Sequence, residues 1–131
     1  RAALDDAALN PQDVDYINAH GTATIEGDPV EIEAIRAVFG DGGTRPAVSG
    51  TKSMHGHLLG AAGAIEAIVT ILSLREQAIP PTAHLDTIDP ACAGVDHVSV
   101  TRRDQPLSTA LSNSFAFGGS NAVLAFRAAS Q

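Results

Sequence analysis

The sequence predicts an α/β domain in which helices cover a mixed, largely parallel β-sheet. Three observations lead to this prediction. Helical and extended patterns alternate along the chain, and such alternation is typical of crossover connections between parallel strands. The 131 residues are 44% hydrophobic but only 4% aromatic, so the core is built from small aliphatic side chains. Polar turns containing glycine follow the extended segments, at the strand ends where α/β sheets carry their sites.

A short helix and a strand open the chain. Residues 1–9 have an amphipathic helical pattern, and the helix is predicted to end at Asn10 and Pro11 because proline disfavours helical backbone before it. Residues 14–18 (Val-Asp-Tyr-Ile-Asn) predict a strand. The strand leads directly into a turn that carries His20.

A second helix follows a loop. Asp28 is predicted to cap it, Pro29 fits the first helical position, and Glu31 stands three residues after Asp28, as in a capping pattern. This local explanation makes a catalytic role for the two carboxylates the weaker interpretation. The helix is predicted to stop at residues 40–43, which include three glycines. Its apolar face consists of Ile32, Ile35, Val38 and Phe39.

Residues 47–50 (Ala-Val-Ser-Gly) predict a short strand that delivers Lys52. A loop containing His55 and His57 comes next. Residues 58–74 are then almost entirely apolar and predict a helix that ends near residues 75–77. This stretch is marginal in length for a membrane span and carries Glu66 at its centre, so a buried helix is the better interpretation.

The last third of the chain is predicted to be mainly extended. Two prolines at 80 and 81 fix an extended connector, and residues 97–101 alternate weakly as a strand. Residues 110–114 and 121–127 predict two more strands on either side of a loop, Phe-Ala-Phe-Gly-Gly, at residues 115–119.

The overall charge disfavours some classes of partner. Fifteen acidic residues against eight basic ones give a net charge of −7, and no basic cluster is present, so nucleic acid is not expected as a partner. The single cysteine, Cys92, excludes an internal disulfide and fits a reducing compartment. No signal peptide is apparent, and a cytoplasmic location is therefore expected.

Two histidines and one lysine are the strongest candidates for chemistry. His20, Lys52 and His57 each follow or interrupt an apolar run in a glycine-containing segment. Two imidazoles and an ammonium are hydrogen-bond donors suited to a developing oxyanion. Because no cysteine or serine lies in a recognisable nucleophile motif, the chain is interpreted as part of an active site.

The other histidines have simpler interpretations. His84 and His97 have no motif around them and are expected to be structural. His55 is either exposed to solvent or a neighbour of the site. The pair formed by His55 and His57 could suggest metal binding, but no cysteine or carboxylate stands at ligand spacing, so no metal is expected.

Three blocks of sequence resemble the β-ketoacyl-acyl-carrier-protein synthases. Residues 17–24 (Ile-Asn-Ala-His-Gly-Thr-Ala-Thr), with Asp28 and Glu31 downstream, resemble the first histidine block of that family. Residues 51–63 (Thr-Lys-Ser-Met-His-Gly-His-Leu-Leu-Gly-Ala-Ala-Gly) resemble the lysine and second histidine block. Residues 112–121 (Ser-Asn-Ser-Phe-Ala-Phe-Gly-Gly-Ser-Asn) resemble the C-terminal glycine loop. The resemblance implies the C-terminal half of a thiolase-like fold, covering residues 1–131 and lacking the N-terminal half that bears the nucleophile.

The resemblance also implies roles for individual residues. His20 and His57 would stabilise the enolate formed by decarboxylation, Lys52 would orient its neighbours, and Glu66 would support the lysine. Thr22 and Thr24 would bind the phosphopantetheine arm. The resemblance assigns the remaining substrate-binding positions to Phe115, to the gating residue Phe117, and to Gly118 and Gly119.

The function implied is that of a 3-oxoacyl-[acyl-carrier-protein] synthase of fatty acid elongation, an acyltransferase that joins an acyl thioester to malonyl-acyl-carrier protein. Its partners would be the acyl carrier protein, the missing N-terminal half and a second copy in a homodimer, with no cofactor besides the phosphopantetheine arm. Cys92 lacks the surroundings of the family nucleophile, so the chain alone is expected to be inactive. Two alternatives remain open: a ketosynthase domain of a polyketide synthase, and a non-catalytic half that binds a synthase or carrier protein.

Overall fold

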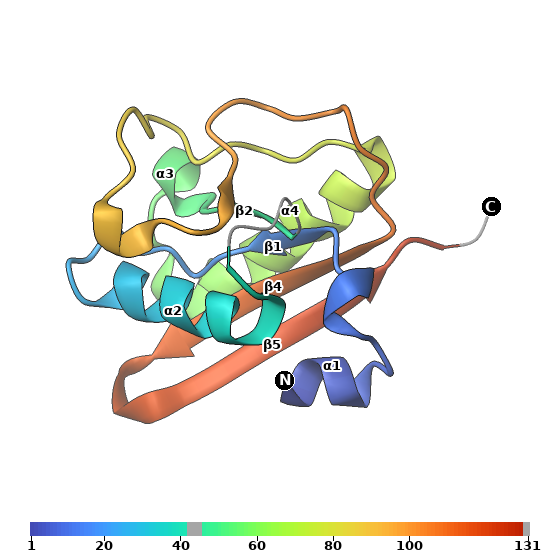
Figure 1. Cartoon of the computed structure of the whole chain (residues 1–131), viewed down its shortest axis with the longest axis horizontal. Coiled ribbons are helices and arrows are strands. Elements are labelled where there is room, and N and C mark those ends of the chain that lie inside the picture. Colours follow the sequence, from blue (N-terminus) through green and yellow to red (C-terminus); the bar gives the residue numbers. More distant parts are fainter. Residues whose placement is uncertain (42–45, 130–131) are drawn as a thin grey trace.

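The computed structural model describes residues 1–41 and 46–129, and it contains a single five-stranded sheet in the order β3-β2-β1-β4-β5 (Figure 1). The first four strands run parallel and β5 pairs antiparallel with β4. The predicted α/β architecture with a mixed sheet is therefore confirmed. The strands are β1 (Tyr16–Asn18), β2 (Ala47–Ser49), β3 (Asp96–His97), β4 (Thr109–Ala116) and β5 (Ser120–Arg127).

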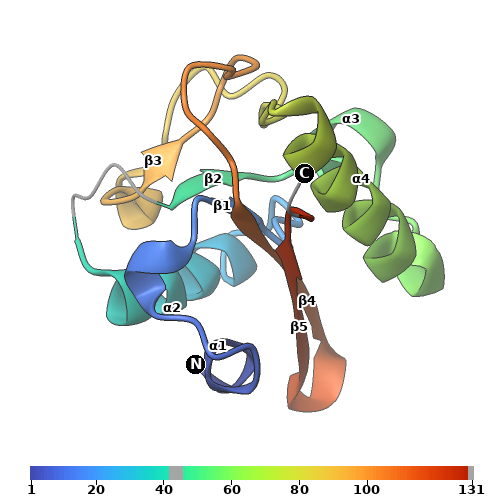
Figure 2. The same ribbon diagram turned by 90° about the vertical axis from the view of Figure 1, so that its right-hand side faces the viewer.

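Helices cover both faces of the sheet (Figure 2). On one side lie α1 (Ala2–Asp6) and α2 (Gly27–Phe39), and on the other lies α4 (Ala62–Glu76), while the short helix α3 (Lys52–His55) follows the end of β2. Four single 3₁₀ turns complete the described elements: η1 (Pro11–Asp13), η2 (Leu59–Ala61), η3 (Pro90–Cys92) and η4 (Phe117–Gly119).

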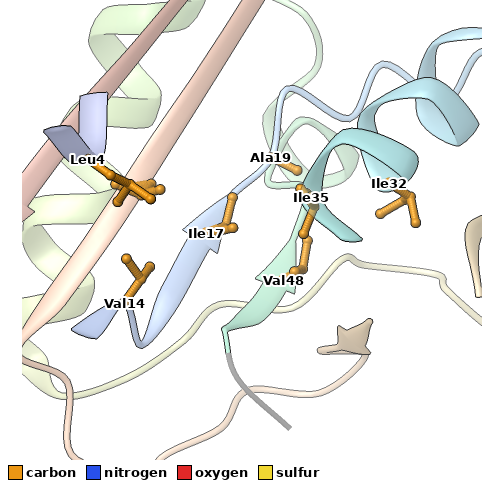
Figure 3. Close-up of a cluster of buried hydrophobic side chains, with 8 residues drawn as sticks. Leu4, Val14, Ile17, Ala19, Ile32, Ile35 and Val48 are labelled. Atoms are coloured by element: carbon orange, nitrogen blue, oxygen red, sulfur yellow. The ribbon is translucent and has the colours of Figure 1, made fainter. Parts of the chain in front are cut away.

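The central strand β1 divides the core into two layers. Because successive side chains of a strand point to opposite faces, Ile17 packs toward α2 while Tyr16 packs toward α4. Figure 3 shows the first layer, in which Ile17 and Val48 from the sheet meet Ile32 and Ile35 from α2. The second layer contains Tyr16, Ala47, Leu74, Ile79, Val98, Leu107 and Ala110.

The register of the sheet sets the position of the site. Asn18, the last residue of β1, is aligned with Ser49, the last residue of β2, and with Ser112 of β4, so β1 and β2 end at the same edge while β4 continues beyond it to Ala116. The turns that carry His20 and Lys52 leave from this edge, as expected for an α/β sheet.

The boundaries of the first two helices differ from the prediction. The first helix ends at Asp6 instead of residue 9, and Ala8 has a positive φ of 50°, which interrupts helical backbone. Helix α2 begins at Gly27 with Glu26 at its N-cap, so the predicted cap at Asp28 is wrong. The Thr24 hydroxyl instead accepts the Gly27 N–H at 3.1 Å. Of the predicted stop at residues 40–43, the last two lie outside the described residues.

The segments after β2 also differ from the prediction. Lys52 lies in the first turn of helix α3, where a loop was expected. The apolar helix begins at Ala62 instead of Leu58, because Leu59 has a φ of 50° and residues 59–61 form a 3₁₀ turn. The predicted strand at 97–101 is reduced to β3 at Asp96–His97, and β4 extends two residues beyond the predicted 114.

Helix α4 exposes much of its apolar surface. Ile68 and Ile71 are 52% and 47% exposed, and Leu72 is 38% exposed, although the same helix buries Glu66 completely. Among the described residues, no helix combines the length and hydropathy needed to cross a membrane. The exposed side chains therefore lie on a helix face that no described segment of the chain covers.

Candidate active site

Lys52 is held at the centre of the edge formed by β1 and β2. It is only 7% exposed and forms an ion pair with Glu66 of α4, which is 0% exposed. Its Nζ also donates a hydrogen bond to the backbone oxygen of His20 at 2.6 Å. Buried charges require such partners, and the pair explains why an otherwise apolar helix contains a carboxylate. Lys52 and Glu66, two of the predicted site residues, are therefore in direct contact.

A hydrogen-bonded network holds Glu66 and its strand neighbours in place. Asn18 Nδ2 lies 3.3 Å from both the backbone oxygen of Glu66 and the hydroxyl of Thr70. The Thr51 hydroxyl donates to Asn18 Oδ1 at 3.2 Å. The residue before the lysine, the end of β1 and one turn of α4 are thereby joined, so the lysine and its counter-ion are fixed relative to the sheet.

The two histidine rings lie beside each other. The rings of His20 and His57 have a centroid separation of 5.6 Å and an interplanar angle of 86°. The Phe115 ring lies on another side of His20, with its centroid 5.8 Å away. Residues from the ends of β1 and β4 and from the loop before α4 therefore meet at one point.

Hydrogen bonds define the tautomer of both histidines. Lys52 Nζ lies 3.4 Å from His20 Nδ1, and the backbone N–H of Leu59 donates to His57 Nδ1 at 3.1 Å. An ammonium and an amide can only donate, so each Nδ1 accepts and each neutral ring carries its proton on Nε2. Two imidazole N–H donors are consequently available at the same edge.

Burial keeps His20 neutral. Desolvation lowers the pKa of His20 below the ordinary value of 6.5, and the positive charge of Lys52 lowers it further, while Glu66 acts in the opposite direction. A neutral His20 at physiological pH retains both the Nδ1 acceptor for the lysine and the Nε2–H donor.

Glu31 anchors the turn that carries His20, a role that the sequence analysis missed. Its two carboxylate oxygens accept the backbone N–H groups of His20 and Gly21, both at 2.9 Å, and Asn113 Nδ2 donates to it at 3.0 Å. The predicted capping role for Glu31 is wrong because its carboxylate, 5% exposed, points into the site instead of back to its own helix start.

A cavity of about 360 Å³ opens beside these residues. Lys52, His57 and Thr22 line it together with side chains of residues 82–92. The Thr22 and Thr24 hydroxyls lie 3.2 Å apart, and only the first of them lines the cavity. Among the described residues, no group of three or more histidine, cysteine, aspartate or glutamate side chains is arranged to hold a metal ion.

The loop between β4 and β5 is exposed at its tip. Phe117 is fully exposed, whereas Phe115 packs on His20. Gly118 and Gly119 both have a φ of +80°, and a Cβ added at either one would meet no atom within 4 Å. Only glycine adopts this backbone at low cost, so the loop presents bare backbone and one phenyl ring to its surroundings.

Comparison with known proteins identifies the family. Residues 1–86 match the family described as "Beta-ketoacyl synthase, C-terminal domain". The chain belongs to the β-ketoacyl synthase family. It is 50% identical over 127 residues to a Staphylococcus aureus protein named 3-oxoacyl-[acyl-carrier-protein] synthase 2 and 51% identical over 127 residues to nodulation protein E of Rhizobium leguminosarum bv. trifolii. Each alignment covers 97% of this chain and 31% of the relative, so this β-ketoacyl synthase chain spans about a third of their length.

Solved ketosynthases have the same fold. The structure titled "The ishigamide ketosynthase/chain length factor" matches with a TM-score of 0.93 and 39% identity, covering 99% of this chain and 32% of that one. A β-ketoacyl synthase from Burkholderia phymatum matches with a TM-score of 0.91 and 42% identity, covering 98% and 31%. The thiolase-like fold predicted from the sequence is thereby confirmed.

The one cysteine of this β-ketoacyl synthase chain does not resemble an activated nucleophile. Cys92 ends η3, packs partly against the core beside α2 and lines the cavity. Burial raises the pKa of its thiol, and the carboxylates of Asp28 and Asp89 raise it further. A reactive cysteine needs the opposite environment. Among the other histidines, His97 Nε2 donates to the backbone oxygen of Cys92 at 2.7 Å. His55 Nδ1 donates to the backbone oxygen of Gly56 at 2.8 Å, and its Nε2 lies 3.2 Å from the Thr51 hydroxyl.

Proposed function

We propose that this chain is the C-terminal part of a 3-oxoacyl-[acyl-carrier-protein] synthase and that it supplies the decarboxylation machinery of a Claisen condensation. The pair of Nε2–H donors on His20 and His57 is the observation that carries the proposal. Two such donors suit an oxygen that gains negative charge during a reaction, and each is worth about 3 kcal/mol of transition-state stabilisation.

The proposed reaction consists of a decarboxylation followed by the formation of a carbon–carbon bond. In malonyl thioester, the bond between the carboxylate carbon and the α-carbon breaks, carbon dioxide leaves, and the electron pair forms an enolate with its charge on the thioester oxygen. His20 and His57 would hydrogen-bond that oxygen. The α-carbon then attacks an acyl thioester on a cysteine, a carbon–carbon bond forms, and the cysteine thiolate leaves and takes up a proton.

Lys52 is proposed to orient His20 and to keep the site positively charged. Its ammonium is used by Glu66 and by two atoms of His20, so it has no free position for proton transfer to a substrate. Glu66 neutralises the buried charge, and Glu31 fixes the backbone from which His20 projects.

The acyl carrier protein is the proposed partner that delivers malonate. The cavity beside Lys52 and His57 offers a route for its phosphopantetheine arm. The Thr22 hydroxyl, which belongs to a lining residue, and the Thr24 hydroxyl 3.2 Å from it would be the hydrogen-bonding groups. One solved relative, with a TM-score of 0.91 and 37% identity, is titled as a type II polyketide synthase acyl-carrier protein in complex with its ketosynthase. This title supports a carrier protein as the partner class. A cytoplasmic location is part of the proposal.

The nucleophile and much of the acyl pocket are proposed to come from the part of the protein outside this chain. The exposed apolar face of α4 and the protruding Phe117 fit a covering N-terminal half, since both would otherwise remain in water. Phe117, Gly118 and Gly119 would then lie beside the acylated cysteine, with Phe117 as its gate. The complete enzyme is proposed to be a homodimer.

Separating the two half-reactions tests the proposal. In the full-length protein that carries this segment, His20→Ala and His57→Ala should each slow release of carbon dioxide from malonyl-acyl-carrier protein by about 100-fold or more. Transfer of an acyl group to the cysteine should change much less, because that step does not generate the enolate. Equal loss of both steps, or no loss of carbon dioxide release, would contradict the assigned roles.

A polyketide ketosynthase is the second candidate. It is favoured by the 0.93 TM-score with the ishigamide ketosynthase/chain length factor, although the identity of 39% is below the 50% found with 3-oxoacyl-[acyl-carrier-protein] synthase 2. The products of repeated extension discriminate the two. A fatty acid enzyme accepts fully reduced acyl chains and adds one unit, whereas a polyketide enzyme extends chains that retain keto groups.

A further inference from the structure

An extended segment after α4 is fixed to the sheet independently of the active site. This segment, residues 79–83, begins at Ile79, which is 0% exposed and forms paired backbone hydrogen bonds with Arg102 at 2.9 and 3.0 Å. Thr82 N donates to the backbone oxygen of Val98 at 2.8 Å. Two prolines between these anchor points limit backbone freedom. Residues 79–83 are therefore a rigid feature of the fold.

The same segment forms hydrogen bonds with the turn that carries Lys52. The Thr82 hydroxyl oxygen accepts the backbone N–H of Gly50 at 2.8 Å. The backbone N–H of Ala83 donates to Ser53 Oγ at 2.8 Å, and Ser53 Oγ donates to the backbone oxygen of Gly50 at 2.8 Å. The lysine thus lies between two residues, Gly50 and Ser53, that are both tied to residues 79–83.

The lysine turn needs such an external support. Helix α3 has only four residues and receives no side-chain cap from Thr51, so its own hydrogen bonds do not make it rigid. The Gly50 backbone also packs tightly on the histidine turn, because a Cβ added at Gly21 would lie 3.4 Å from Gly50 Cα. A shift of Gly50 would therefore move Lys52 and disturb the turn of His20 together.

We propose that Thr82 is a positioning residue of this site: by accepting the Gly50 N–H it fixes the Lys52 turn and, through the lysine, the orientation of His20. The inference rests on the proposed decarboxylation function and extends it to a side chain on a separate segment. The lysine transmits the position because its Nζ bonds both the backbone oxygen and Nδ1 of His20. Small displacements of catalytic groups have large effects on rate.

The test compares two substitutions at Thr82 in the full-length synthase. Thr82→Val keeps the shape but removes the acceptor and leaves the Gly50 N–H without its partner, whereas Thr82→Ser keeps the hydroxyl. Thr82→Val should slow carbon dioxide release from malonyl-acyl-carrier protein by about 10-fold and leave acyl transfer to the cysteine nearly unchanged. Thr82→Ser should restore the rate. Thr101→Val removes an exposed hydroxyl from the same part of the chain and should have no effect.

Hydrogen exchange at the Gly50 amide provides a readout that does not depend on activity. Thr82→Val should accelerate this exchange, and Thr82→Ser should not. Unchanged exchange and unchanged carbon dioxide release in Thr82→Val would overturn the inference, as would equal loss of both half-reactions. If Thr82→Val does not fold, Ser53→Ala removes the second contact with residues 79–83 and should produce the same selective loss. A wild-type protein that releases no carbon dioxide would reject the proposed function, while Gly50 exchange would still decide whether Thr82 fixes the turn.

Discussion

Lys52 Nζ donates to the backbone oxygen of His20 at 2.6 Å and lies 3.4 Å from Nδ1 of the same residue. The lysine therefore contacts both the backbone and the ring of the histidine. Glu66 forms an ion pair with the same lysine, and Glu31 accepts the backbone N–H of the histidine. The position of one imidazole is thus determined by two carboxylates and one ammonium that come from three helices.

Removing one partner of the buried ion pair should destabilise the full-length protein strongly. Glu66→Ala leaves Lys52 buried without a counter-charge, and we expect a loss of about 3–5 kcal/mol in the free energy of unfolding. The double variant Lys52→Met with Glu66→Leu replaces both charges by apolar groups of similar size and should recover most of that loss while remaining inactive in decarboxylation. Urea denaturation of wild type and both variants measures these differences in the free energy of unfolding. A double variant as unstable as Glu66→Ala would contradict the explanation.

Acid should weaken both activity and stability through His20. Its pKa in the folded protein is lowered, chiefly by burial, so below the unfolded value of about 6.5 the unfolded state binds more protons than the folded state. The contribution of His20 to stability is complete above that pH and declines as the pH falls toward the folded pKa. Protonation of His20 Nδ1 would also oppose Lys52, so decarboxylation should fall in the same range. Unfolding titrations between pH 7 and pH 5 should have a smaller slope in His20→Asn than in wild type.

Cys92 should be dispensable for acyl transfer. Burial and two nearby carboxylates raise the pKa of its thiol, so little thiolate is available at neutral pH. The full-length Cys92→Ala variant should still gain one acyl group when incubated with acyl-carrier-protein thioester, as measured by intact mass. Loss of acylation in this variant, with an unchanged circular dichroism spectrum, would instead make Cys92 the nucleophile.

The 131-residue chain by itself should associate through α4. Ile68 and Ile71 are each about half exposed, on a helix face left uncovered within the part of the chain that the structure describes. Sedimentation of the isolated chain should reveal a dimer or larger species at micromolar concentration. Replacing both isoleucines by glutamate should give a monomer, whereas the same change at the exposed Val100 should not. A wild-type chain that remains monomeric at every concentration would refute the expectation.

Local patterns pointed to the central residues of the candidate site better than to the residues that fix the backbone around them. His20, Lys52 and Glu66 were predicted because each interrupts an apolar pattern or lies in a recognisable block. Glu31 was missed because its spacing from Asp28 imitates a helix cap, and only the fold reveals that its carboxylate reaches the His20 turn. No sequence pattern indicated a role for Thr82. Its hydrogen bond with Gly50 depends on how the chain folds back between the two residues, which residue spacing does not predict.

The predicted boundaries of two elements were wrong for a related reason. The start of α4 was predicted at the first apolar residue, Leu58, but apolar character does not distinguish a helix from the 3₁₀ turn that precedes it. The short strand β3 was misplaced because its pairing with β2, and not its own composition, defines it. Tertiary contacts decide such boundaries, so they could not be obtained from local propensity.

The pairing of β1 with β4 has a consequence for how the protein is made. Asp15, next to β1, accepts hydrogen bonds from Ser108, 93 residues later, and Tyr16 is aligned with Ala110. The central strand can therefore acquire its second neighbour only after nearly all of the segment has left the ribosome. Until then its amides on that side are unpaired and its apolar side chains partly uncovered, which makes the nascent segment a client for chaperones and a late folder. Shortening the chain by its last two strands would remove the β4 partner of β1 while His20, Lys52 and His57 remain in the chain.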